Sequence, residues 1–172
     1  PATMTRPFLL VGLLLIGLGG CNPFAPALEE GDPFAVLMGD PRTIEGFFQN
    51  FKAAYELRDI SLYEPLIDSA FVFVFYDYDA QVERQWGFSQ ELEATRRLFL
   101  ATSAIQLQWN QVLLQEVFDN GRQARVVRSF NLLVTLEQGS LFRSSGNVNF
   151  LLVRPDTLSP WRLRRWRDES EL

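Results

Sequence analysis

The order of helical and strand-like patterns along the chain is the feature that most restricts its fold. Apolar residues at helical spacing predict an amphipathic helix from the Asp40-Pro41 pair to about residue 57. Residues 105–118 and 123–137 are instead typical of long strands, and Asp119-Asn120-Gly121 between them is a strong hairpin signal. Helices followed by a run of strands favour an α+β domain, with helices packed on one face of a curved, mostly antiparallel sheet.

The remaining elements follow from caps and alternation. Asp59 is placed to cap a short second helix, and Ser89 to cap a third helix over residues 90–102. Further strands are predicted over residues 71–78, 144–154 and 161–168. In the last strand Trp161 and Trp166 differ in parity, so only a β-bulge would bring both rings to one face.

The first twenty residues have the pattern of a bacterial lipoprotein signal peptide. Thr5-Arg6 supplies a short positive region, and residues 7–18 form an uncharged apolar run that is shorter than the ~20 residues of a membrane-spanning helix. Leu18-Gly19-Gly20-Cys21 resembles the lipobox of bacterial lipoproteins, which predicts cleavage before Cys21 and lipidation of its thiol. A multiply acylated N-terminus anchors firmly, so we expect a lipid-anchored protein of the bacterial cell envelope. Whether that membrane is the inner or the outer one stays open.

Composition excludes several kinds of chemistry. Cys21 is the single cysteine and the chain has no histidine, so disulfides, His/Cys metal sites and histidine-based nucleophile machinery are not available. We expect no cofactor and no metal. The formal net charge of −5 and the export signal both argue against nucleic acid as a partner.

The chain divides into three parts. Residues 1–20 are the predicted signal peptide, and residues 21–40 are the lipidated cysteine with a Pro/Gly-containing flexible tether. Residues 41–172 have the length of one domain with a core of its own.

A resemblance to a known family rests on residues 48–75, FQNFKAAYELRDISLYEPLIDSAFVFVF. This helix, break, second helix and strand resemble the opening of the NTF2-like (SnoaL-like) fold, a cone in which a bent sheet wraps a long N-terminal helix. Residues 86–89 (WGFS) and the closing Trp161-Arg162-Leu163 with Trp166 and Asp168 also fit the pattern. The resemblance implies the fold over about residues 40–170. It implies little about chemistry, because the fold includes enzymes, ligand binders and assembly modules.

Catalytic members of the fold place carboxylates, tyrosines or histidines inside the cone. Here the first strand offers residues 71–75 (FVFVF) at the corresponding place, and the first helix offers Phe51 instead of a tyrosine. The familiar acid–base set of the family is therefore missing.

The strongest cluster of candidate site residues is Tyr76-Asp77-Tyr78-Asp79 at the end of the first predicted strand. A carboxylate beside phenols in an apolar cavity could act as a base or hold a polar ligand group. Asp77 and Asp79, with Tyr55, are thus the weak catalytic candidates. The alternative is a strand that runs out into solvent and ends in an acidic turn.

Two further groups have a functional and a structural interpretation. Tyr55, Trp86 and Trp109 could line a ligand pocket together with Tyr76 and Tyr78, or they could be core residues. Residues 161–167 (WRLRRWR) could form a strip that binds anionic lipid or phosphate. They could equally be a final strand whose arginines pair with carboxylates, each exposed pair contributing little.

Three functions remain in competition. The leading hypothesis is a non-enzymatic, membrane-anchored domain that binds a small apolar ligand or a protein partner, with homodimerisation through the sheet. The second is an isomerase- or dehydratase-like enzyme that uses carboxylates and tyrosines in the cone. The third is a dimeric scaffold module without a ligand.

Overall fold

The computed structural model describes residues 37–171, without the side chains of residues 169–171. The predicted signal peptide, Cys21 and most of the tether lie outside the described residues. The described part contains three α-helices, one 3-10 turn and six strands. Their bounds are α1 Ile44–Leu57, α2 Ile60–Tyr63, η1 Glu64–Leu66, β1 Ile67–Asp77, β2 Val82–Gly87, α3 Phe88–Ala101, β3 Thr102–Phe118, β4 Gln123–Leu136, β5 Leu141–Val153 and β6 Arg162–Glu171.

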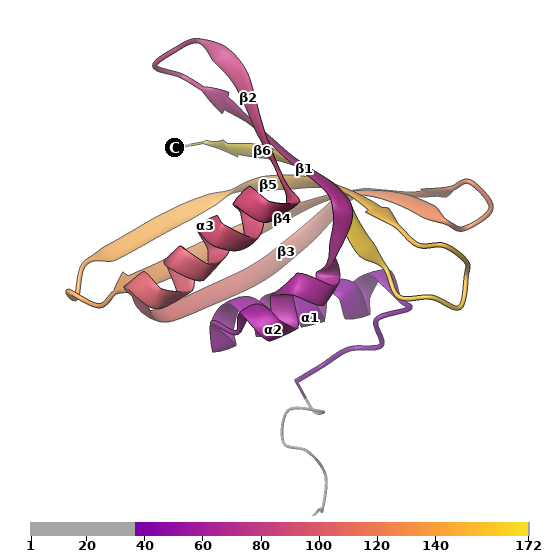
Figure 1. The fold of residues 1–172 in the computed structure, drawn as a ribbon, viewed down its shortest axis with the longest axis horizontal. Helices are drawn as coiled ribbons and strands as arrows, with labels where there is room; N and C mark the ends of the chain where they lie inside the picture. Colours follow the sequence, from indigo (N-terminus) through magenta and orange to yellow (C-terminus); the bar gives the residue numbers. More distant parts are fainter. Residues whose placement is uncertain (1–36, 172) are drawn as a thin grey trace, which may run out of the picture. The chain divides into compact units, whose positions relative to one another are not determined.

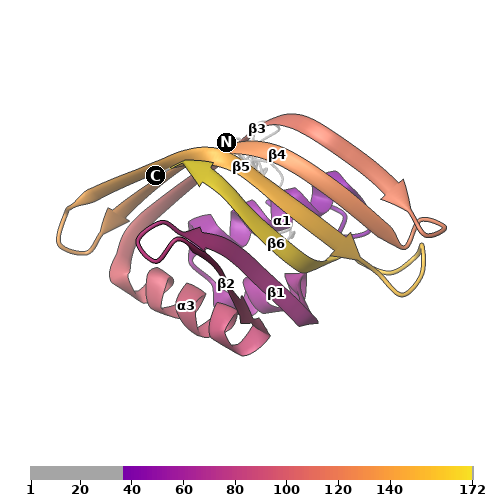
Figure 2. The ribbon, with the colours of Figure 1, turned by 90° about the horizontal axis from the view of Figure 1, so that it is seen from above.

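All six strands form one sheet in the order β2-β1-β6-β5-β4-β3. Every neighbouring pair is antiparallel except β1 and β6, which run parallel. Figure 1 shows the sheet curving over α1, with α3 lying against its concave side. Figure 2 shows the same sheet from above, with β3 at one edge and the β1–β2 hairpin at the other. The predicted α+β architecture is confirmed.

The core lies between the concave face of the sheet and the helices. Phe47, Phe48 and Phe51 project from one side of α1 and are buried. On the sheet, Val126 pairs with Phe150 and Phe150 with Trp166, so neighbouring strands present a continuous apolar row. Burial of large aromatic and branched side chains, each contributing about 1.5–3 kcal/mol, stabilises this arrangement.

Asp59 caps α2 as predicted, with its carboxylate accepting from the Ser61 amide, whereas the starts of α1 and α3 differ from the prediction. Helix α1 begins at Ile44, because the hydroxyl of Thr43 accepts the hydrogen bond from the Gly46 amide. The Asp40 carboxylate instead accepts from the Arg42 amide in the turn before the helix. Helix α3 begins at Phe88 after Gly87, rather than after Ser89, and the Gln90 side chain accepts from the Gly87 amide at 3.3 Å.

The last strand contains the β-bulge that is needed to bring both of its tryptophans to one face. Leu151 pairs with Arg165 and Leu152 pairs with Leu163, which leaves Arg164 as the extra residue of β6. Because the bulge resets the alternation, Trp161 and Trp166 both pack into the core despite their opposite parity.

Candidate functional site

Aromatic rings fill most of the interior. The ring of Phe51 stacks on Tyr55 at 4.8 Å between centroids and also contacts Trp109, Phe150 and Trp166. The first strand, which has apolar residues where a catalytic base would be placed, is likewise packed, with Phe71 and Phe73 buried. The cone therefore leaves little room for a large ligand.

A small cavity that is open to solvent lies between α1, α3 and strands β1, β2 and β6. Its volume is about 160 Å³. Aromatic rings form most of its wall, and a carboxylate and a hydroxyl lie among them. The lining residues are Tyr55, Phe73, Trp86, Glu91, Ala94, Thr95, Leu98 and Trp166.

The polar centre of this cavity is the carboxylate of Glu91, which is only 4% exposed. Its Oε1 accepts hydrogen bonds from the Tyr63 hydroxyl at 2.7 Å and the Thr95 hydroxyl at 3.1 Å. Its Oε2 accepts one from the indole Nε1 of Trp86 at 2.7 Å. A buried carboxylate is tolerated only with such partners, and here they come from α2, α3 and β2.

The two buried phenols beside Glu91 remain neutral. Burial, followed by the negative charge of Glu91, raises the pKa of Tyr55. Burial also raises the pKa of Tyr63 well above its usual value, with smaller contributions from Tyr55 and Glu91. Because desolvation disfavours the phenolate, both side chains stay protonated over the physiological range, and the hydroxyl of Tyr63 donates to Glu91.

The indole of Trp166 forms another wall of the cavity. Its ring meets Phe73 edge to face at 5.1 Å and Phe150 at 5.3 Å. Its Nε1 is buried and has no hydrogen-bond partner among the described residues. An unsatisfied buried donor costs about 1–3 kcal/mol, so this N–H is the polar group at the site that a ligand or a water could satisfy.

The structure brings together two of the residues that the sequence singled out. Tyr55 and Trp86 both line the cavity. Trp109 lies elsewhere in the interior, where its Nε1 donates to the Phe48 carbonyl at 2.9 Å and its ring meets Phe48 edge to face.

The acidic cluster lies outside the cavity, at the end of the β1–β2 hairpin. Tyr76 and Tyr78 are 47% and 64% exposed and contact each other. Asp77 accepts from the Ala80 amide and forms an ion pair with Arg84. These two interactions, the amide first, lower the pKa of Asp77, and Asp79 is exposed in the turn. The arrangement is that of a charged turn rather than of a buried base.

Sequence reasoning missed Glu91, Tyr63, Thr95 and Trp166 as site residues. A signal for part of this set exists, because Glu91, Thr95 and Leu98 recur at i, i+4 and i+7 and so share one face of α3. That face also turns toward the sheet, as the burial of Glu91 and Thr95 shows.

Two other features are absent from the described part of the chain. No group of three or more His, Cys, Asp and Glu side chains is arranged there to hold a metal ion. None of its helices combines the length and apolar character needed to cross a membrane.

Comparison with known proteins shows the fold. No protein-family model and no curated protein matches the sequence. Among solved structures, a conserved protein from Planctomyces limnophilus is 15% identical, with a TM-score of 0.64 over 74% of this chain and 93% of that one. An NTF2-like superfamily protein from Salmonella enterica is 14% identical, with a TM-score of 0.59 over 77% and 91% of the two chains.

A candidate scytalone dehydratase from Novosphingobium aromaticivorans is also similar, at 10% identity and a TM-score of 0.64 over 76% of this chain and 83% of that one. The chain therefore has the NTF2-like fold, which occurs in enzymes and in proteins without catalytic activity. At these identities the likeness concerns the fold alone.

Proposed function

We propose that this protein is a lipid-anchored component of the bacterial envelope whose NTF2-like domain binds a small, mostly apolar ligand without transforming it. The binding proposal rests on one observation: Trp166 lines a cavity, and its buried Nε1 has no hydrogen-bond partner among the described residues. The anchoring proposal rests on the lipobox-like Leu18-Gly19-Gly20-Cys21.

The size and walls of the cavity define the ligand. A volume of about 160 Å³ lies below the ~300–1,000 Å³ of drug-sized pockets and is close to that of a cavity known to bind benzene. Because one water occupies ~30 Å³ of liquid, this volume corresponds to the mass of a few waters, which is a ligand on the order of 100 Da. Phe73 and Trp86 stack at 4.4 Å and provide a flat apolar wall. A single-ring compound with one hydrogen-bond acceptor, directed at Trp166, fits these constraints.

Glu91 supports binding rather than catalysis. A general base presents a free carboxylate oxygen to the proton that it removes. Both oxygens of Glu91 are instead occupied by donors of the protein. We interpret this carboxylate as the group that orders Tyr63, Trp86 and Thr95 around the cavity.

Native mass spectrometry of the full chain, purified from its host envelope in detergent, tests this function. We expect a bound species on the order of 100 Da that Trp166→Phe releases, because phenylalanine keeps an aromatic wall but has no N–H. Tyr78→Phe is the control, since this ring is exposed and does not line the cavity. A ligand-free protein would instead favour the scaffold hypothesis, and a co-purifying protein would favour a protein partner.

One observation favours an enzyme as the second candidate. The cone does hold a carboxylate and two tyrosines, Glu91 with Tyr55 and Tyr63, although not the carboxylates that the sequence indicated. In an isomerase or dehydratase, substrate binding would displace Trp86 from Oε2 of Glu91, and a neutral phenol would stabilise the developing oxyanion. Turnover of the bound compound by the wild type, abolished in Glu91→Gln, would replace our binding proposal with this one.

The anchor has a separate test. Cys21→Ser should block lipid attachment and release the protein from the membrane fraction. A Cys21→Ser variant that is processed normally and stays with the membrane would contradict the anchoring proposal while leaving ligand binding untouched.

A further inference from the structure

The face of the sheet opposite the helices carries a concentration of arginines. Arg125, Leu151 and Arg165 are paired across β4, β5 and β6, and they alternate with the buried Val126 and Phe150. Side chains alternate between the two faces of a sheet, so these three point outward. Neighbouring strands lie ~4.8 Å apart, which places the two arginines on either side of Leu151 with ~10 Å between their backbones.

Two hollows on this outer face adjoin one another at Leu151. One has a volume of about 610 Å³ and is lined by four arginines and two aspartates. The other, of about 490 Å³, is lined by three arginines and one glutamate. Cationic groups thus exceed carboxylates here, on a chain whose formal net charge is −5.

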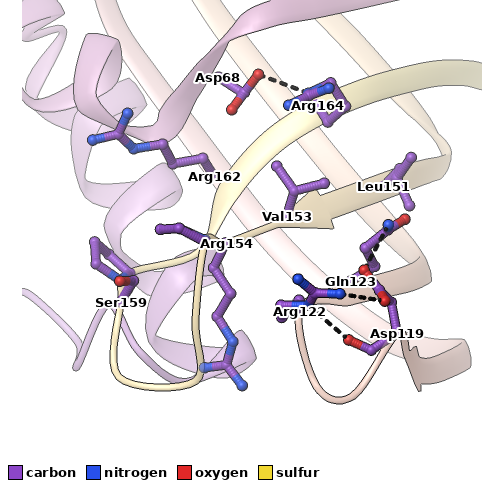
Figure 3. Close-up of a pocket in the computed structure, with 12 residues that line it drawn as sticks. Asp68, Asp119, Arg122, Gln123, Leu151, Val153, Arg154, Ser159, Arg162 and Arg164 are labelled. Carbon is purple, nitrogen blue, oxygen red and sulfur yellow. Dashed lines mark hydrogen bonds and ion pairs between the residues drawn. The ribbon is translucent and has the colours of Figure 1, made fainter.

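The ion pairs on this face leave some arginines without a partner. Arg164 pairs with Asp68, Arg122 with Asp119 and Arg167 with Glu83. Figure 3 shows the first two pairs and the side chain of Arg162, which forms no such ion pair. Within the described part of the chain, the side chains of Arg162 and Arg165 are exposed and make no hydrogen bond or ion pair. They are the groups free to bind an external anion.

Exposed apolar side chains lie at the same end of the sheet. Leu158, in the β5–β6 loop, is 80% exposed, and Phe118, at the start of the β3–β4 turn, is 43% exposed and lines the second hollow. The two loops are in contact, because the Arg154 amide donates to the Arg122 carbonyl and the Arg154 side chain to the Gly121 carbonyl. Arginines beside protruding apolar residues are typical of surfaces that meet a lipid interface.

The N-terminal edge of the domain lies beside this end. The Trp161 amide donates to the Pro41 carbonyl, and Arg154 donates to the Arg42 carbonyl. Figure 1 shows the β5–β6 loop next to the start of α1. Leu37, the first described residue, is separated from Pro41 by at most about 14 Å of chain. The polypeptide leading from Cys21 therefore joins the domain close to the arginines.

We propose that this end of the domain binds the anionic phospholipid surface of the membrane. In this arrangement Arg162 and Arg165 contact headgroup phosphates, and Leu158 enters the interface. The site is distinct from the cavity beside Glu91, and the inference does not depend on a ligand there. The lipid anchor, where present, would favour the contact by holding the domain near the bilayer.

A single fluorescent label on the full-length protein tests the proposal. With Cys21 acylated, Leu158→Cys introduces the one free thiol, because the chain has no other cysteine. The labelled protein is reconstituted into vesicles of phosphatidylcholine, with or without phosphatidylglycerol, that carry a headgroup-level quencher. Phe142→Cys is the matched control, since it is also exposed but lies beside the β4–β5 turn, away from both arginine-lined hollows.

We expect quenching at position 158, not at 142, only in the anionic vesicles and weakened by salt. Arg162→Gln with Arg165→Gln should lower the ratio of docked to undocked protein about fivefold per arginine. Equal quenching at both positions, or equal quenching with and without phosphatidylglycerol, would overturn the proposal.

The mass of the N-terminal peptide reports acylation independently. If that peptide carries no acyl chain, only the anchoring proposal fails. The membrane-binding proposal is then tested with the same label at position 158 in a Cys21→Ser variant that is mixed with the vesicles.

Discussion

The hydroxyl of Tyr63 donates a 2.7 Å hydrogen bond to Glu91 across 28 residues of sequence. This bond joins α2 to α3, and the bond from Trp86 to the other carboxylate oxygen joins the end of β2 to the same point. Three elements that cover one end of the cone therefore depend on a single buried carboxylate. The stability of this region and the shape of the cavity are coupled through it.

Replacing Glu91 with glutamine should destabilise the domain by about 1–3 kcal/mol, because one acceptor oxygen becomes a donor NH₂. In one amide orientation the Trp86 N–H loses its acceptor, and in the other the hydroxyls of Tyr63 and Thr95 must give up their bonds to a carboxylate and accept instead. Equilibrium unfolding in urea measures the change. Glu93→Gln is the control on the same helix, and it should cost less than about 1 kcal/mol because its ion pairs with Arg96 and Arg97 are exposed. Equal losses in the two variants would show that Glu91 does not organise the cluster.

Stability should decline at alkaline pH because of Tyr55 and Tyr63. Burial raises the pKa of both phenols above the usual value of 10.0, so their contribution is complete below pH ~10 and is lost as the pH rises toward the folded-state value. Above pH ~10 the unfolded chain binds fewer protons than the folded one. The free energy of unfolding should then fall by up to about 1.4 kcal/mol per pH unit for each tyrosine.

The double variant Tyr55→Phe/Tyr63→Phe should flatten this alkaline slope in urea unfolding experiments repeated across the pH range. A slope that is unchanged in the double variant would assign the alkaline loss to other groups.

Gly46 should tolerate no side chain. A Cβ at this position would overlap the carbonyl oxygen of Asp40 in the turn before α1, and such overpacking costs about 1–3 kcal/mol. Gly87→Ala is the matched control, because its Cβ would lie 3.7 Å from the nearest backbone oxygen, an ordinary contact. Thermal unfolding should give a clearly lower melting temperature for Gly46→Ala than for Gly87→Ala. The reverse order would mean that the Asp40 turn does not pack on α1 as described.

Deleting Arg164 should cost little more than neutralising it. Without this bulge residue, Leu163, Arg165 and Trp166 can still pair in turn with Leu152, Leu151 and Phe150, so regular alternation keeps Trp166 on the inner face. Arg164→Gln and the deletion both remove a partly exposed ion pair with Asp68, worth about 1 kcal/mol or less. Tryptophan fluorescence during unfolding measures both variants, and a loss of about 3–5 kcal/mol in the deletion, as for a displaced buried tryptophan, would contradict the pairing described for β6.

Much of the fold could be predicted because its signals are local. The apolar face of α1 and the Asp119-Asn120-Gly121 turn each lie within a few residues, and Asn120 and Gly121 do adopt the positive φ that this turn requires. Strand β2 was not predicted, since its sequence VERQWG lies at the sheet edge and is largely exposed. An edge strand has little apolar alternation to reveal it.

The candidate site was only partly predictable because its polar partners meet through tertiary structure. Tyr55 and Trp86 were identified as large aromatic residues, whereas Glu91 has the appearance of an ordinary surface residue in a charged helix. Its burial depends on Tyr63, 28 residues away, and on an indole donor from β2. The acidic hairpin residues attracted attention as a motif, yet the solvent-exposed end of β1 places them outside.

The NMR signal of the Trp166 indole N–H tests most directly whether this group is the polar contact of a small bound ligand. The spectrum of ¹⁵N-labelled full-length protein, purified from its host, is compared with that of the same protein after unfolding, ligand extraction and refolding. We predict that the Trp166 Nε1–H resonance, assigned by its loss in Trp166→Phe, shifts between the two samples. The Trp109 resonance should stay, because its donor is bound to the Phe48 carbonyl. Identical Trp166 resonances in the two samples would contradict the proposed site.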